Sequence, residues 1–261
     1  MSVKNSSNGN GKGSVGVARG YFTFIKELPK CFKEIGGVIP SSPHLAKSMI
    51  KPIYSRTTPQ RILEVGPGTG PFTRAILKEM GLQDTLTVCE INPRFVAELK
   101  ANLSTNPDFI RHRDRVTFFE GPIQQLAAET PELKFDLIVS SLPFNCFNDV
   151  LVTEILQVYQ SMLADNGTLT FCEYVGVRVF SRVFGSAERR QRAQGVQRAV
   201  HYWLSEASKA ARIRRRISLL NVPPARTFEV CAQPAKQRFD EVHNGYQARA
   251  VGALREARES N

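Results

Sequence analysis

The chain has 261 residues, of which 42% are hydrophobic, and it carries a formal net charge of +11 at neutral pH. This length and composition predict one globular domain with a hydrophobic core, and the lack of any run of about eighteen apolar residues excludes a membrane-spanning helix. Five scattered cysteines without a C-x-x-C pair argue against a zinc site, and the basic excess predicts binding to nucleic acid or an anionic membrane surface.

The first fifty residues differ in pattern from the rest. Residues 1–16 have no apolar h-region, so we expect a disordered leader rather than a signal peptide, and a cytoplasmic protein. Residues 19–35 space apolar side chains by three and four, which predicts an amphipathic helix with Tyr21 on its apolar stripe. Such a stripe fits a membrane surface, and core packing is the alternative. A short helix is expected to begin near Ser42.

From residue 61 the sequence alternates between strand and helix patterns. We expect strands at residues 61–65, 86–90, 116–120, 135–140 and 168–172, with helices at 71–79, 94–103, 123–128 and 150–163. A late strand is expected at 222–230, and residues 216–222 could form another. This alternation implies right-handed crossovers and a doubly wound, mostly parallel α/β sheet that binds its ligand at the carboxyl ends of the strands.

We predict that residues 178–216 form a basic insertion before the late strands. They contain eleven lysines and arginines against two glutamates, and apolar residues from Val196 to Ala211 share one helical face. We therefore expect a helical segment that contacts an anionic surface. The tail at residues 233–261 is polar and has no evident packing role.

The segment LEVGPGTG follows the first expected strand and suggests a nucleotide site. Gly66, Gly68 and Gly70 would let the backbone approach a ligand closely. Glu64 would repel a phosphate, whereas it suits a ligand with an amine or a positive charge. Glu90 ends the second strand about twenty residues later, where an acidic side chain can accept both ribose hydroxyls. S-adenosylmethionine has these features and carries no phosphate.

Three segments carry a resemblance to class I S-adenosylmethionine-dependent methyltransferases: LEVGPGTG, CEINP and SSLPF. The resemblance covers residues 21–230 and implies a Rossmann-like sheet of seven strands. It also implies a cofactor-covering segment at 17–52 that includes the helix, and a methyltransferase domain at 53–232. Further cofactor contacts are implied at Ser42, Pro67, Ile91, Asn92, Gly121, Pro122, Ile123, Ser140, Ser141 and Leu142.

Two branches of that superfamily share the E-V-G-P-G-x-G form: ribosomal RNA adenine dimethylases and bacterial phospholipid N-methyltransferases. Adenine methylases carry N-L-P-Y after the fourth strand, and its Asn accepts from the base amine. Here Ser141 replaces that Asn. SSLPF, IGGVIPSS and NVPPA are instead similar to phospholipid N-methyltransferase segments. The resemblance therefore implies methylation of phosphatidylethanolamine to phosphatidylcholine. An ornithine lipid and ribosomal RNA adenine are the alternative substrates.

The same resemblance implies the substrate site. Aromatic faces of Tyr21, Phe144 and Tyr174 would stabilise the methylated ammonium, and Arg178 would bind a lipid phosphate. We expect a monomer without a metal, which binds the inner face of the cytoplasmic membrane peripherally and does not act on nucleic acid. One departure concerns the adenine of the cofactor. Pro122 stands where many relatives have an Asp, so this contact must come from Glu120, the Ile123 amide or Gln124, or is missing.

Overall fold

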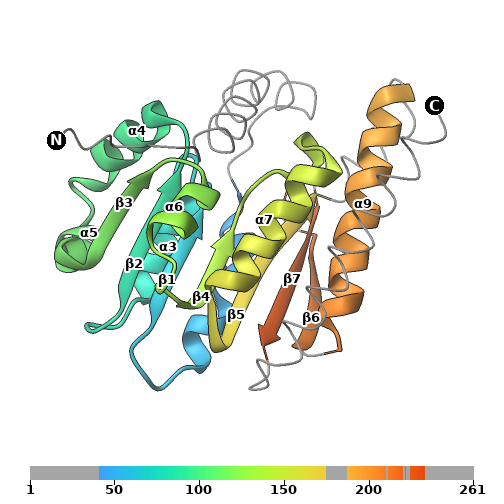
Figure 1. Cartoon of the computed structure of the whole chain (residues 1–261). Helices are drawn as coiled ribbons and strands as arrows, with labels where there is room; N and C mark the ends of the chain where they lie inside the picture. Colours follow the sequence, from blue (N-terminus) through green and yellow to red (C-terminus); the bar gives the residue numbers. More distant parts are fainter. Residues whose placement is uncertain (1–40, 175–186, 210, 220, 222–223, 233–261) are drawn as a thin grey trace, which may run out of the picture. The chain divides into compact units, whose positions relative to one another are not determined.

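A computed structural model describes residues 41–174, 187–209, 211–219, 221 and 224–232 (Figure 1). The expected leader, the amphipathic helix with Tyr21, the polar tail and Arg178 all lie outside the described residues. Within the described part, no helix combines the length and the apolar character needed to cross a bilayer.

Seven strands form one sheet in the order β3-β2-β1-β4-β5-β7-β6. Strands β1 to β5 are parallel, whereas β7 runs antiparallel between β5 and β6. Because β6 is antiparallel to β7, it runs in the same direction as β5. The predicted doubly wound α/β fold is therefore confirmed. The strands are β1 Arg61–Val65, β2 Thr85–Glu90, β3 Val116–Glu120, β4 Phe135–Ser140, β5 Leu163–Tyr174, β6 Ala211–Ser218 and β7 Ala225–Ala232.

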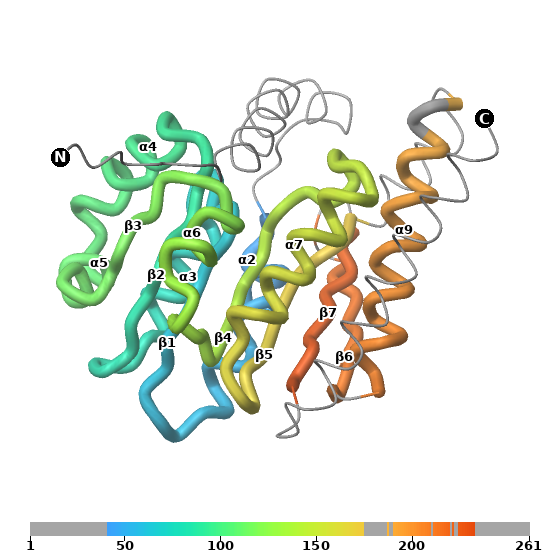
Figure 2. Tube along the Cα trace, in the orientation of Figure 1, coloured from blue at the N-terminus to red at the C-terminus, as the bar shows by residue number. Residues whose placement is uncertain are grey.

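Helices cover both faces of this sheet. Helices α6, α7 and α9 lie on one face, and α2 and α3 lie on the other (Figures 1 and 2). The core on the α2 and α3 side includes the fully buried side chains of Leu45, Met49 and Ile76. The helices are α2 Pro43–Met49, α3 Pro71–Glu79, α4 Pro93–Leu103, α5 Pro107–His112, α6 Ile123–Glu129, α7 Asp149–Met162 and α9 Ala187–Ala207, with 3-10 turns at Lys51–Ser55, Arg113–Arg115 and Phe144–Cys146.

We predicted the basic segment to be one helical insertion, but it contains both a helix and a strand. Helix α9 ends at Ala207, and a strand, β6, begins at Ala211, a residue that we expected on the helical face. Arg212, Arg214 and Arg216 lie on one face of the strand, at its period of two, and Arg215 lies on the other, whereas we expected these charges on a helix. Arg214 and Arg216 face Glu229 of β7, so pairing with β7 explains why this stretch is a strand.

Candidate functional site

The glycine-rich turn between β1 and α3 has the backbone that its sequence predicts. Gly66, Gly68 and Gly70 have φ values of 72°, 55° and 81°, all in the left-handed region that favours glycine. A Cβ atom at Gly66 would lie 2.6 Å from the Leu142 side chain, and one at Gly70 would lie 2.3 Å from Leu99. A Cβ at Gly68 would meet nothing within 4 Å. Gly68 therefore borders open space, where a ligand fits.

Glu90 is fixed at the end of β2 by backbone amides. Its Oε2 accepts from Gly68 N at 3.4 Å, and its Oε1 accepts from Asn92 N at 2.9 Å. Burial raises the pKa of Glu90, and these amide hydrogen bonds act in the opposite direction. The carboxylate is thereby held beside the glycine-rich turn, and each oxygen retains a second lone pair for a ribose hydroxyl.

Glu64 lies in β1, just before the turn, and is fully buried. Neither of its carboxylate oxygens has a hydrogen-bond partner among the described residues. Burial raises the pKa of Glu64 to about 8, Thr73 opposes the rise, and the neighbouring Glu90 adds to it. A buried acid without a partner is costly unless a ligand supplies one. The orphaned carboxylate and the open space at Gly68 together fit the amino group and nucleoside of S-adenosylmethionine.

The end of β4 is tied to the same turn. Ser141 donates its backbone N–H to Val65 O at 3.0 Å, and its hydroxyl donates to the Gly66 carbonyl. The Ser140 hydroxyl lies 2.8 Å from the Tyr159 hydroxyl, and Ser140 is buried. The Ser141 hydroxyl therefore serves to position the glycine-rich turn.

At the end of β3, the structure narrows the candidates for the adenine contact. Gly121 N donates to Glu90 O at 3.0 Å, which places the start of α6 next to Glu90. The Glu120 carboxylate pairs with Lys100 Nζ at 3.0 Å on the exposed surface. The carboxamide N and O of Gln124 are buried and have no hydrogen-bond partner among the described residues. Glu120 is thus engaged elsewhere, whereas Gln124 retains its full hydrogen-bonding capacity.

Three segments that are distant in sequence meet beyond the end of β5 and the start of β7. Asn221 Oδ1 accepts from Ser42 N at 2.8 Å, and the Ser41 and Tyr174 hydroxyls are 3.4 Å apart. The Ser42 hydroxyl accepts from Leu45 N and caps α2. Burial raises the pKa of Tyr174 to about 12. The roles predicted for Ser42 and Tyr174 stay predictions, and the hydrogen bond from Ser42 to Asn221 was not expected, although the NVPPA segment was singled out.

Phe144 belongs to a buried aromatic cluster. Its ring centroid lies 5.7 Å from that of Phe171 and 6.1 Å from that of Phe147. Phe171 also stacks on Phe228 at 4.8 Å. Phe144 is 3% exposed, so its ring packs within the protein, and its contact with a substrate stays a prediction. All the predicted cofactor contacts likewise stay predictions, those of Pro67, Ile91, Pro122, Ile123 and Leu142 among them.

The side chains available as metal ligands also bear on the chemistry of the site. Among the described residues, no group of three or more His, Cys, Asp or Glu side chains is placed to hold a metal ion. The features that fit S-adenosylmethionine lie at the carboxyl ends of β1 and β2, and the end of β4 is tied to the same turn.

Comparison with known proteins agrees with this geometry. Residues 62–167 match the family model described as "Methyltransferase domain". An ornithine lipid N-methyltransferase of Singulisphaera acidiphila is 27% identical over 63% of this chain and 84% of its own length. A malonyl-[acyl-carrier protein] O-methyltransferase of Halalkalibacterium halodurans is 29% identical, but the match spans 46% of this chain and 41% of that protein. The O-methyltransferase TomG of Streptomyces achromogenes, solved in complex with SAM, shares the fold with a TM-score of 0.56 at 15% identity, over 80% of this chain and 89% of that one.

Proposed function

We propose that the protein is a class I, S-adenosylmethionine-dependent methyltransferase that acts on the amine of a membrane aminolipid, since residues 62–167 match a methyltransferase domain. The first candidate substrate is phosphatidylethanolamine, methylated successively to phosphatidylcholine. An ornithine lipid is the second, because the relative that matches over 84% of its length bears that name. The protein would act at the inner face of the cytoplasmic membrane, bound peripherally.

The observation that carries this proposal is the hydrogen bonding of Ser141. An adenine N6-methylase needs a side-chain carbonyl after β4 to accept from the base amine. Here that position has a serine, and its hydroxyl donates to the Gly66 carbonyl. A serine side chain has no carbonyl oxygen that could accept a hydrogen bond from the amine of a base. This favours a flexible alkyl amine over a flipped adenine.

The reaction needs little chemistry from the protein. S-adenosylmethionine supplies a methyl group that is already activated on a sulfonium. The glycine-rich turn, Glu64 and Glu90 would hold the cofactor. The remaining task is to hold a neutral amine in line with that methyl group and to exclude water. Backbone carbonyls at residues 142–144 would accept hydrogen bonds from the amine, and the buried Glu173 at the end of β5 would take the ammonium proton. Tyr174 and Tyr21 would stabilise the methylated product, and Arg178 the lipid phosphate.

The test is a transfer assay with the full chain and methyl-labelled S-adenosylmethionine. The acceptors are vesicles that contain phosphatidylethanolamine, vesicles that contain ornithine lipid, amine-free phosphatidylglycerol vesicles, and ribosomal RNA. We expect label in the lipid extract of the aminolipid vesicles and none in the amine-free vesicles. Label in RNA alone, or label in no lipid, would refute the proposal. The ratio between the two aminolipids decides the headgroup.

A further inference from the structure

Strand β6 forms one edge of the sheet. One side of it pairs with β7, and within the described part of the chain no strand pairs with the other side. Four of its eight residues are arginines, and they occupy both faces of the strand. Charged side chains on an edge strand discourage pairing with another strand. They also give the edge a positive electrostatic field, which attracts an anionic partner.

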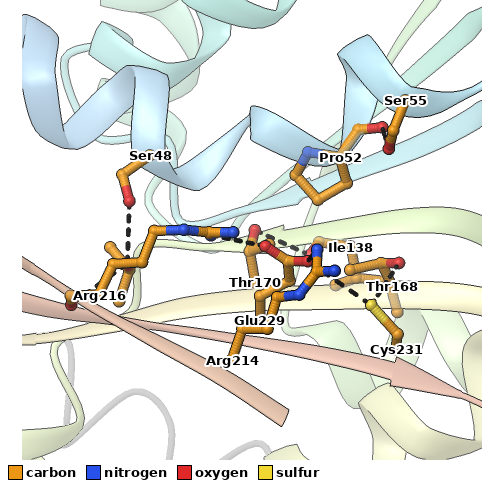
Figure 3. Close-up of polar contacts among 11 residues, drawn as sticks. Ser48, Pro52, Ser55, Ile138, Thr168, Thr170, Arg214, Arg216, Glu229 and Cys231 are labelled. Atoms are coloured by element: carbon orange, nitrogen blue, oxygen red, sulfur yellow. Dashed lines mark hydrogen bonds and ion pairs between the residues drawn. The ribbon is translucent and has the colours of Figure 1, made fainter. Parts of the chain in front are cut away.

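Most of this charge is not neutralised by the residues that the structure describes. Arg214 Nη1 lies 3.1 Å from Glu229 Oε1, and Arg216 Nη1 lies 2.6 Å from Oε2 of the same carboxylate (Figure 3). The Arg215 guanidinium lies over the Phe228 ring, 6.0 Å from its centroid. Among the described residues, Glu229 is the only carboxylate that pairs with an arginine of β6. Four arginines, including Arg212, against one glutamate leave three positive charges on the edge.

The carboxyl end of this strand is apolar and exposed. Ile217 is 60% exposed, and Leu219, just past the strand, is 75% exposed. Ser218 pairs with Ala225, which also pairs with Tyr174 at the end of β5. The apolar tip therefore lies at the same edge of the sheet as the glycine-rich turn. Basic side chains followed by exposed aliphatic ones at the level of the site make an amphiphilic edge.

We propose that the β6 edge docks the enzyme on an anionic bilayer, with Ile217 and Leu219 inserted among the headgroups and Arg212 and Arg215 on lipid phosphates. This inference rests on the proposed aminolipid methyltransferase function. A nucleic acid would satisfy the arginines but would leave the two aliphatic side chains in water. A bilayer surface satisfies both. The orientation brings the carboxyl edge of the sheet to the headgroups, where a lipid amine is found.

The first experiment measures binding of the full chain to phosphatidylcholine vesicles with and without phosphatidylglycerol. The Ile217→Thr/Leu219→Ser variant is compared with Ile110→Thr/Leu82→Ser, which changes the same residue types at 52% and 70% exposed positions that precede β3 and β2. Loss of two inserted aliphatic groups should weaken binding to the anionic vesicles about tenfold, whereas the control should bind as the wild type does. Equal binding by both variants would overturn the proposal. So would flotation that does not depend on phosphatidylglycerol.

A second variant reports insertion directly. The sequence has one tryptophan, Trp203, which is buried, so a new tryptophan at the surface can be followed against a constant background. Leu219→Trp should shift its emission to shorter wavelength with anionic vesicles, and Leu82→Trp should not. Unshifted emission of Leu219→Trp on bound vesicles would overturn the proposal even if affinity falls. Replacement of Arg212 and Arg215 by Gln should weaken binding to these vesicles more than binding to RNA; the reverse order would also overturn it.

Failure of docking and failure of the function give different results. With a short-chain, soluble aminolipid, the Ile217→Thr/Leu219→Ser variant should methylate at the wild-type rate. Equal losses on soluble and vesicular substrate would show a defect in the site instead of the edge, and would refute docking. If the wild type methylates no aminolipid in any form, the proposed function is wrong. Flotation and tryptophan emission would still test whether the β6 edge binds the bilayer.

Discussion

Replacement of Glu64 by Gln should stabilise the protein without cofactor, and increasingly so at higher pH. The pKa of Glu64 is raised from 4.5 to about 8, so the folded state keeps a proton that the unfolded chain has released. Since the unfolded state binds fewer protons, stability falls as the pH rises from the unfolded value through 8. At 1.36 kcal/mol per pKa unit, the free energy of unfolding falls below its value at low pH by roughly 2 kcal/mol at pH 6 and by roughly 5 kcal/mol at pH 9.

Glutamine keeps the shape of the acid and removes this titration. The difference in melting temperature between Glu64→Gln and wild type should therefore grow by roughly 5–10 °C between pH 6 and pH 9, from a change of about 3 kcal/mol. Thermal unfolding without cofactor measures it. In the same variant, calorimetry should show weaker cofactor binding, because the carboxylate that would pair with the amino group is gone.

Glu229 provides a control of opposite sign. Burial raises the pKa of Glu229, but its two arginine partners lower it further, so the net shift is downward. Glu229 therefore stabilises the protein at pH values above its pKa in the unfolded chain, and this stabilisation is lost only as the pH falls through its pKa in the folded state. Glu229→Gln should lower the melting temperature by a constant amount between pH 6 and pH 9. A pH-independent effect of Glu64→Gln, or a difference that shrinks as the pH rises, would refute the reasoning about the orphaned carboxylate.

Three further predictions concern the cofactor site and the core. Glu90→Ala should weaken cofactor binding roughly tenfold to a hundredfold, because charged hydrogen bonds are lost, and unchanged affinity in calorimetry would contradict this role. Gly66→Ala should lower the melting temperature more than Gly68→Ala, because only its methyl group meets Leu142; Gly68→Ala should mainly impair cofactor binding, as paired melting and binding measurements would show. Phe171→Ala should cost about 3–5 kcal/mol in chemical denaturation, and a loss below about 1 kcal/mol would mean that the aromatic cluster can collapse into the space.

The sequence pattern located most of the sheet. Strands β1, β3 and β4 have the predicted bounds, since buried strands between turn signals carry a clear apolar pattern. β5 begins five residues earlier than expected, at Leu163, because Asp165, Asn166 and Gly167 resemble a turn. Asn166 has a φ of 60°, and the register with β4 shifts here, so the irregularity lies within a strand.

The site was predictable where backbone conformation dictates residue type. Glycines with positive φ and an acidic residue at the end of β2 leave a signal in the sequence. The link from Asn221 to Ser42 leaves none, because it joins residues 179 positions apart and depends on the tertiary fold. Likewise, the arginines of β6 resembled a helical surface, because the pairing of Arg214 and Arg216 with Glu229 on β7 depends on the tertiary fold.

The order of the last three strands has a consequence for biosynthesis. β7 lies between β5 and β6 and is made last, so β6 has no partner until residues 225–232 have left the ribosome. The half of the sheet that holds the glycine-rich turn can assemble earlier, from strands already synthesised. During that interval β6 must wait unpaired, with its arginines exposed and Glu229 not yet made. The region at the end of β5 and the start of β7 is therefore the last part of the sheet to form, after the half that holds the glycine-rich turn.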